Sequence, residues 1–280
     1  MRRLWARALG GLILAGLGVL LVTPTGCASA QRAALPVAER AAPRGLFRVP
    51  TENRIVVLTI DDAPSSRTNE ILGILARHDA RATFFVLTDQ VDDIGTDALR
   101  RAVRQGHEIA LHGTRDQKAT ALGEEGFAAM VREADTALRA IARPAPYFRP
   151  GHGAYDPDYM DAPLGAHGYA APRDDARLYV LASFVPWDAG AATQTGDADR
   201  NAVRARRYAD SLASGLFPGA IVVFHDGEAG GREARAAATL VSLDRFLERA
   251  TEQGFRAVTL SEAVGRPSDE PPGARGAGER

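Results

Sequence analysis

Short apolar runs alternate with amphipathic helical patterns along most of the chain. The runs that predict strands are Arg54–Ile60, Ala82–Leu87, Glu108–Leu111, Tyr147–Phe148, Leu178–Phe184, Ala220–Phe224 and Phe255–Thr259. Apolar positions at helical spacing predict helices over Asn69–His78, Asp97–Gln105, Gly126–Ile141, about 201–213 and Ala234–Gln253. Strands that alternate with helices are typical of an α/β parallel sheet, and about seven such units in one chain favour a (β/α) barrel.

The alternation covers residues 54–265, which we interpret as one domain. Residues 31–53 are rich in Ala, Pro and Arg and are predicted to be a linker. Residues 266–280 contain no apolar side chain larger than that of Ala, so we expect a disordered tail.

Residues 1–30 have the layout of an export signal: a basic start, an apolar run and a stretch of small residues. The apolar run, Ala8–Val22, is shorter than the roughly 20 residues that a membrane-spanning helix needs. We therefore expect an exported protein that is periplasmic, extracellular or anchored to a membrane as a lipoprotein.

The chain has one cysteine, Cys27, which follows Gly26 near the end of the apolar run. This position resembles the acylated cysteine of a bacterial lipoprotein, although Pro24 departs from that pattern. Cleavage after Ala30 would instead remove Cys27 and release a protein without a thiol. Both alternatives stay open, and neither leaves the domain a disulfide, a thiolate nucleophile or a cysteine zinc site.

Composition and charge exclude several classes of protein. The chain is 45% hydrophobic and 25% charged, which is ordinary for a globular protein and excludes a wholly disordered chain. The 34 basic and 35 acidic residues give a net charge of −1, and the arginines are scattered among acidic residues. No basic patch indicates a nucleic-acid partner.

Polar side chains stand at the ends of five predicted strands, where the reactive groups of parallel α/β proteins gather. In chain order they are Asp61-Asp62, His112, Arg149, Trp187-Asp188 and His225-Asp226. Each has an ordinary structural interpretation when taken alone: a helix cap, a core histidine, an ion pair or a loop cap. Their shared placement is what indicates an active site.

The adjacent carboxylates of Asp61 and Asp62 need a nearby cation, because like charges in one site raise each other's pKa. A metal ion bound by Asp62, His112 and Asp116 would supply it. Carboxylate and imidazole ligands with one open position suit a catalytic divalent ion, with zinc the favoured metal. His107 precedes its strand and is not expected to be a ligand.

Several segments in order resemble the motifs of the polysaccharide deacetylase family, the metal-dependent carbohydrate esterases related to chitooligosaccharide deacetylase. They are IVVLTIDDAP with ATFFVL, GHEIALHGTRD, YFRPGHGAY, AIVVFHDG and GFRAVTLSEAV, and they extend from about residue 54 to 264. The resemblance implies a distorted (β/α) barrel that hydrolyses N-acetyl or O-acetyl groups on polysaccharides.

The resemblance also implies roles for individual residues. Asp61 matches the catalytic base, Asp62 and His112 match two metal ligands, and Arg149 matches the arginine that orients the base. The third ligand of the family is a histidine, and Asp116 stands at that position.

Four further residues match the later motifs. His225 matches the catalytic acid, Val223 lines the acetyl pocket, and the backbone N–H of His152 serves the oxyanion. Trp187 and Asp188 match the fourth motif in part. The resemblance implies that Asp188 is a catalytic residue and that Trp187 contacts the substrate. The chain departs from the family at Pro150–Gly153 and at Ala191-Ala192, where a second Asp-Trp pair is expected.

The expected partner is an acetylated glycan such as peptidoglycan or a chitin-like polymer, with membrane attachment if Cys27 is lipidated. Two alternatives remain at this stage. One is a metal-dependent hydrolase of small amides on the same barrel, which the altered motifs permit. The other is a non-catalytic glycan-binding protein of the cell envelope.

Overall fold

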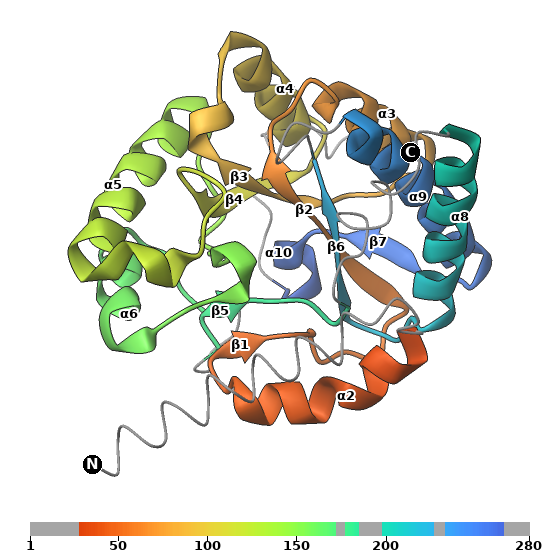
Figure 1. Cartoon of the computed structure of the whole chain (residues 1–280), viewed down its shortest axis with the longest axis horizontal. Coiled ribbons are helices and arrows are strands. Elements are labelled where there is room, and N and C mark those ends of the chain that lie inside the picture. The colour runs from red at the N-terminus through yellow and green to blue at the C-terminus, as the bar shows by residue number, and fades with distance from the viewer. Residues whose placement is uncertain (1–27, 172–176, 185–197, 227–232, 266–280) are drawn as a thin grey trace, which may run out of the picture.

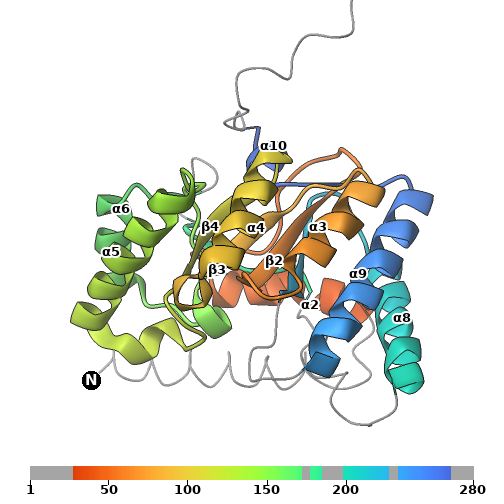
Figure 2. The ribbon, with the colours of Figure 1, turned by 90° about the horizontal axis from the view of Figure 1, so that it is seen from above.

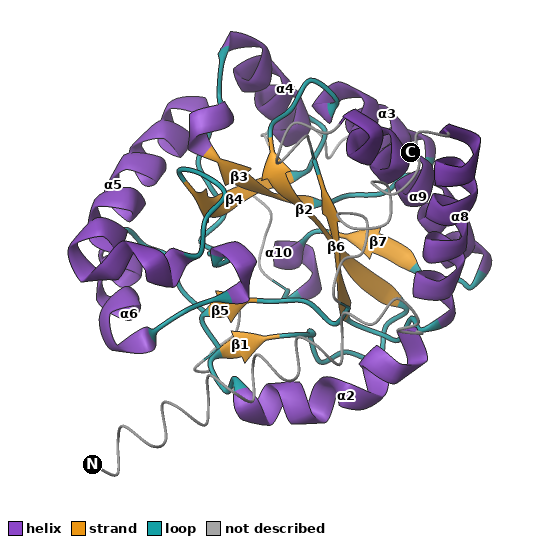
Figure 3. Cartoon of the chain, in the orientation of Figure 1, coloured by secondary structure: helices purple, strands orange, loops and turns teal. Residues whose placement is uncertain are grey.

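The structure is a computed structural model that describes residues 28–171, 177–184, 198–226 and 233–265. Strands and helices alternate along it, as the hydrophobic pattern predicts (Figures 1 and 3). The strands are β1 (Gly45–Leu46), β2 (Ile55–Ala63), β3 (Thr83–Leu87), β4 (Glu108–Gly113), β5 (Tyr179–Val180), β6 (Ala220–His225) and β7 (Arg256–Val258). The α-helices are α2 (Ala28–Ala41), α3 (Thr68–Arg77), α4 (Asp93–Arg104), α5 (Gly123–Ile141), α6 (Pro157–Ala166), α8 (Ala198–Ser214), α9 (Glu233–Glu252) and α10 (Leu260–Ala263).

Strand β2 is the centre of a parallel sheet with the order β4-β3-β2-β6. Strand β7 pairs with residues 55–57 of β2, and β3 pairs with residues 59–63. Strands β1 and β5 form a separate parallel pair.

Single bridges join the two sheets into a closed barrel. Phe148 forms parallel bridges to Leu111 of β4 and Tyr179 of β5, and Arg48 forms an antiparallel bridge to Ala220 of β6. The helices surround the strands on the outside, with α3 and α4 over β2 and β3 (Figures 1 and 2). The predicted distorted (β/α) barrel is therefore confirmed, and the distortion lies where β4 meets β5 and β1 meets β6.

The barrel has an outer and an inner core, because successive strand residues point to opposite faces. Every residue of β2 is buried, as expected for a parallel strand with helices outside it. The inner core contains Leu46, Val49, Val57, Phe85, Ala110, Tyr147, Val180, Ile221 and Leu260. Helix α10 closes the amino end of the barrel, where the Leu260 and Ser261 N–H groups donate to Thr83 and Glu108 at 2.9 and 3.0 Å.

The predicted linker over residues 31–53 is not what the structure contains. Its first part belongs to α2, which packs on α8, and its second part forms β1. Leu35, Leu46 and Val49 are buried. The hydrophobic pattern does not predict these elements, because the buried apolar residues are sparse and Pro36 lies inside the helix. Strand β1 is also too short to show alternation.

Other elements differ in their bounds. Helix α6 was not predicted from the sequence. Asp156 caps it and Pro157 is its first residue, and this pair is a recognisable signal for the start of a helix. Helix α4 begins four residues before the predicted Asp97, because Asp92 caps it by accepting from the Gly95 N–H at 2.7 Å. The predicted strand Leu178–Phe184 is reduced to the two residues of β5.

Most of the predicted export signal, the tail 266–280, Trp187 and Asp188 lie outside the described residues. Within the described ranges, none of the helices combines the length and the apolar character needed to cross a membrane.

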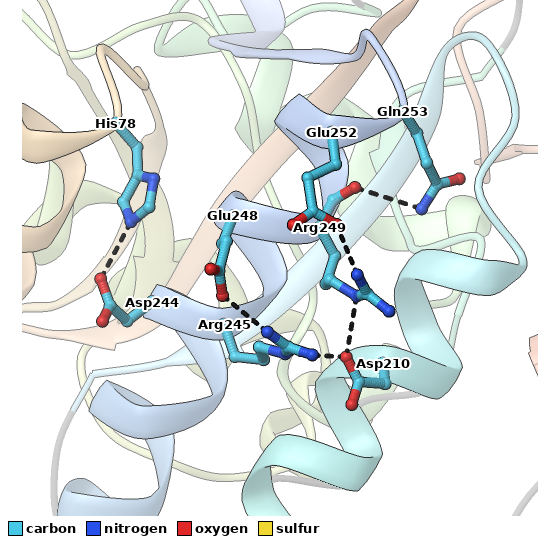
Figure 4. Close-up of polar contacts among 8 residues, drawn as sticks. All are labelled: His78, Asp210, Asp244, Arg245, Glu248, Arg249, Glu252 and Gln253. Carbon is cyan, nitrogen blue, oxygen red and sulfur yellow. Dashed lines mark hydrogen bonds and ion pairs between the residues drawn. The ribbon is translucent and has the colours of Figure 1, made fainter.

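Ion pairs join the outer helices α3, α8 and α9 (Figure 4). Asp210 of α8 accepts from both Arg245 and Arg249 of α9, at 2.8 and 3.1 Å. His78, which follows α3, contacts Asp244 of α9 at 2.9 Å. Such exposed pairs contribute only about 0–1 kcal/mol each to the free energy of unfolding. We assign these pairs a minor structural role.

His107 gives the fold a defined pH dependence. Burial and the nearby Arg81 lower its pKa from 6.5 to about 4, and its Nδ1 accepts from the Ala82 N–H at 3.2 Å. The unfolded chain therefore binds a proton near pH 6.5 that the folded protein does not bind until about pH 4. Stability should fall as pH drops through this window, by roughly 2 kcal/mol at pH 5.

Replacing His107 with Gln, which keeps an acceptor for Ala82, should make this loss of stability shallower. Urea unfolding at pH 7 and pH 5 measures the slope. An unchanged slope in H107Q would contradict the assignment.

Candidate active site

The polar strand ends predicted from the sequence converge at the carboxyl end of the barrel. Asp61 and Asp62 lie just before Ala63, the last residue of β2, and His225 is the last residue of β6. His112 lies near the end of β4, and Arg149 follows the Phe148 bridge. Asp61 and His225 are direct partners in the parallel β2–β6 register. The predicted base and the predicted acid therefore stand side by side on adjacent strands.

Arg149 fixes Asp61 in place. Its Nη1 donates to Asp61 Oδ1 at 2.5 Å and to Thr59 Oγ1 at 2.7 Å. Its other nitrogens donate to the carbonyls of Val180 and Leu181, at 3.2 and 3.0 Å. The guanidinium also lies 4.3 Å from the centre of the Phe85 ring. All of this is buried, so Asp61 keeps one orientation, with one oxygen bound to Arg149 and the other directed toward His112.

His112 faces both carboxylates. Its Nε2 lies 3.5 Å from Asp62 Oδ1 and 3.9 Å from Asp61 Oδ2. Its Nδ1 is 2.8 Å from the Arg149 carbonyl, which can only accept, so Nδ1 carries a proton. Burial opposes a charge on His112, but Asp61 and Asp62 outweigh burial and the pKa of His112 is raised.

Asp62 and His112 fit a divalent cation. A neutral imidazole held through Nδ1 by a carbonyl presents Nε2 as a lone pair, which is how metal-binding histidines are usually oriented. The backbone of Asp62 is left-handed, with φ of 61°, an uncommon conformation that is enriched at functional sites. A cation between Asp62 and His112 would also balance the buried carboxylate charge.

The third predicted ligand, Asp116, is not brought to this pair. Its Oδ1 contacts His152 Nε2 at 3.0 Å instead, and both side chains are about half exposed. Across the described parts of the chain, no group of three or more His, Cys, Asp or Glu side chains is placed to hold a metal ion. Of the three predicted ligands, Asp62 and His112 therefore lie together, whereas Asp116 contacts His152 instead.

Val223 and His152 lie on different elements, β6 and the short turn after Arg149. Val223 is buried and pairs in register with Thr59, two residues before the Asp61–His225 pair. His152 is left-handed, with φ of 56°, in the short turn Gly151–Gly153 that follows Arg149. Trp187 and Asp188 cannot be placed, since they lie outside the described residues.

Asp226 is a buried residue that the sequence places among the polar strand ends but gives no role of its own. Its N–H donates to the Asp61 carbonyl at 2.7 Å, and its carboxylate accepts from Ser65 at 2.6 Å and from Thr68 at 2.5 Å. Burial raises its pKa to about 6. Asp226 thereby ties the end of β6 to the segment that follows Asp61 and Asp62. The sequence signal that points to Asp226 is its position just after a predicted strand, beside His225.

Comparisons with known proteins indicate the family of this chain. The polysaccharide deacetylase family matches residues 48–171. The chitooligosaccharide deacetylase of Bradyrhizobium sp. is 33% identical over 181 residues, 64% of this chain and 74% of the relative. That of Sinorhizobium fredii is 29% identical over 208 residues, 71% of this chain and 87% of the relative.

A solved structure has the same fold. The chitin deacetylase of the fungal pathogen Colletotrichum lindemuthianum superposes with a TM-score of 0.63 at 23% identity, over 80% of this chain and 92% of the other. The fold, the strand-end residues and the sequence matches lead to one assignment. The chain belongs to the polysaccharide deacetylase family.

Proposed function

We propose that this protein hydrolyses the N-acetyl groups of a glycan and releases acetate. The observation that carries the proposal is the side-by-side placement of Asp61 and His225 on β2 and β6, next to the buried Asp62–His112 pair. An amide hydrolase needs a base to activate water and an acid to protonate the leaving amine, both within reach of one carbonyl.

Asp61 is the base in this scheme. Arg149 holds one carboxylate oxygen, so the other is left to take a proton from water. His225 donates a proton to the departing amine nitrogen, and Val223 offers a buried apolar surface for the acetyl methyl group. The His152 N–H, in its left-handed turn, serves the oxygen on which negative charge develops.

Asp62 and His112 would hold a divalent cation, which we propose to be zinc. When bound, such an ion makes water more acidic and polarises a carbonyl group. Carboxylate and imidazole donors suit zinc among the common divalent metals.

The match to chitooligosaccharide deacetylases makes N-acetylated chitooligosaccharides the first substrate to test, followed by peptidoglycan and acetylated xylan. Release of acetate from xylan alone would indicate O-deacetylation. Release from none of the three would favour the alternative of a small-amide hydrolase.

We also propose that residues 1–30 direct export and that Cys27 is lipidated. In support, Ala28 is buried close to Gly215. Processing before Cys27 keeps this contact, whereas cleavage after Ala30 removes Ala28 and the contact with it. Incorporation of labelled palmitate into the wild type but not into Cys27→Ser tests this; equal labelling, or none in either, rejects it.

Asp61→Asn and His225→Ala should each lower kcat/KM for acetate release by about 10²–10⁴-fold, because each removes a proton-transfer group. Circular dichroism should show folded protein in both. Asp61→Asn should also unfold at a lower temperature, since it takes the charged partner from Arg149. Full activity in either variant would refute the roles assigned, and His78→Ala, on the outer surface, is the activity control.

Removal of divalent ions with EDTA should abolish acetate release, and added Zn²⁺ should restore it, because Asp62 and His112 are proposed to hold the ion. Asp62→Asn should need far more Zn²⁺ for recovery than the wild type. Metal analysis should establish that the EDTA-treated protein is free of ions. Undiminished acetate release by that protein would contradict the metal requirement.

Arg149→Met should lower the free energy of unfolding by about 3–5 kcal/mol, because it leaves the buried Asp61 carboxylate without its charged partner. Arg149→Lys keeps the charge but cannot reach Asp61, Thr59 and the two carbonyls together, so its loss should be smaller. Urea unfolding at pH 7 measures both. Equal stability of wild type and Arg149→Met would contradict the clamp.

A further inference from the structure

Asp226 is a fully buried carboxylate that the proposed reaction does not use. It directly follows His225, the last residue of β6 and the proposed acid. Burying a carboxylate costs free energy unless its oxygens accept hydrogen bonds. Both oxygens do so here, because Ser65 Oγ donates to Oδ1 at 2.6 Å and Thr68 Oγ1 donates to Oδ2 at 2.5 Å. With each oxygen held by a different hydroxyl group, the carboxylate keeps one orientation.

The two hydroxyl groups belong to a turn that is itself fixed. Thr68 is fully buried and is the first residue of α3, and the Ser65 N–H donates to Thr68 Oγ1 at 2.8 Å. Ser65 Oγ also accepts from the Arg67 N–H at 2.9 Å. The carboxylate of Asp226 is therefore attached to the start of α3.

The backbone of Asp226 makes a second tie, to β2. Its N–H donates to the Asp61 carbonyl at 2.7 Å, which extends the parallel ladder one step beyond the Asp61–His225 pair. The side chain of Asp61 does not depend on either tie, because Arg149 Nη1 holds it at 2.5 Å. The ties made by Asp226 therefore bear on the acid, His225, more than on the base.

We propose that Asp226 is a positioning residue for the acid. Its carboxylate, anchored by Ser65 and Thr68, holds the end of β6 so that His225 reaches the departing amine nitrogen. This inference rests on the acid role that the proposed function gives to His225. A proton donor must lie within hydrogen-bond reach of the leaving atom, and a displacement of about 1 Å can lower a rate by about 10²-fold. Loss of the carboxylate should thus slow the step that His225 assists.

The direct test compares two substrates that differ in their leaving group. Hydrolysis of an N-acetylated chitooligosaccharide expels an amine, which must gain a proton as its C–N bond breaks. Hydrolysis of 4-nitrophenyl acetate expels a phenolate, which leaves without a proton. His225→Ala should therefore lose activity on the glycan and keep most of it on the ester. Asp61→Asn should lose both activities, because water must be activated in either reaction.

Asp226→Asn should follow His225→Ala rather than Asp61→Asn. Its kcat on the chitooligosaccharide should fall by about 10–100-fold, while KM and hydrolysis of the ester change little. The double variant His225→Ala/Asp226→Asn should be no slower on the glycan than His225→Ala alone, because Asp226 acts through His225. Circular dichroism should show all of these variants folded.

Substitutions of Thr68 give a matched pair that tests the same tie should Asp226→Asn fail to fold. Thr68→Val keeps the shape of the side chain but removes the hydroxyl group that Asp226 accepts from, so it should lower kcat on the glycan selectively. Thr68→Ser keeps the hydroxyl group and should recover most of that loss. His78→Ala, on the outer surface, should leave both activities unchanged.

Equal losses on the two substrates in Asp226→Asn, no loss on the glycan, or a double variant slower than His225→Ala would overturn this inference and leave the proposed function standing. Full activity of His225→Ala on the glycan would overturn the acid role and the inference with it. A wild type that releases no acetate from either the chitooligosaccharide or peptidoglycan would overturn the proposed function as a whole. The failures are therefore distinguishable.

Discussion

The burial of two adjacent carboxylates at the end of β2 is the constraint on which the site depends. Asp61 and Asp62 are nearly inaccessible to water, so each needs a positive or hydrogen-bonding partner. Arg149 balances Asp61, and His112 faces Asp62. The carbonyl of Arg149 in turn contacts His112, so one residue holds both Asp61 and His112.

Arg149 lies where the closure of the barrel is irregular, between β4 and β5. Between β4 and β5 the sheet is reduced to single bridges at Phe148, and β5 itself has two residues. The carbonyls of Val180 and Leu181 therefore accept from the guanidinium. The least regular part of the barrel thus lies next to the site and supplies the acceptors that immobilise its arginine.

The departures of this chain from the polysaccharide deacetylase motifs include two half-exposed residues that contact each other. Asp62 and His112 keep the family pattern, whereas Asp116 and His152 both depart from it. The two departures contact each other, which a sequence comparison position by position does not reveal. The 3.0 Å contact between Asp116 Oδ1 and His152 Nε2 thus links the two departures from the family pattern.

The sequence by itself determined most of the strands and helices and the polar residues at the strand ends, because hydrophobic alternation is local and parallel strands place their carboxyl ends at one edge. It could not determine the packing of residues 31–53, whose few buried apolar side chains find their partners in distant parts of the chain, such as α8 and the inner core of the barrel. Nor could it pair Asp116 with His152, or tie Asp226 to the segment after β2. Those contacts join residues 36 or more positions apart, and only the closed barrel decides which distant charges meet.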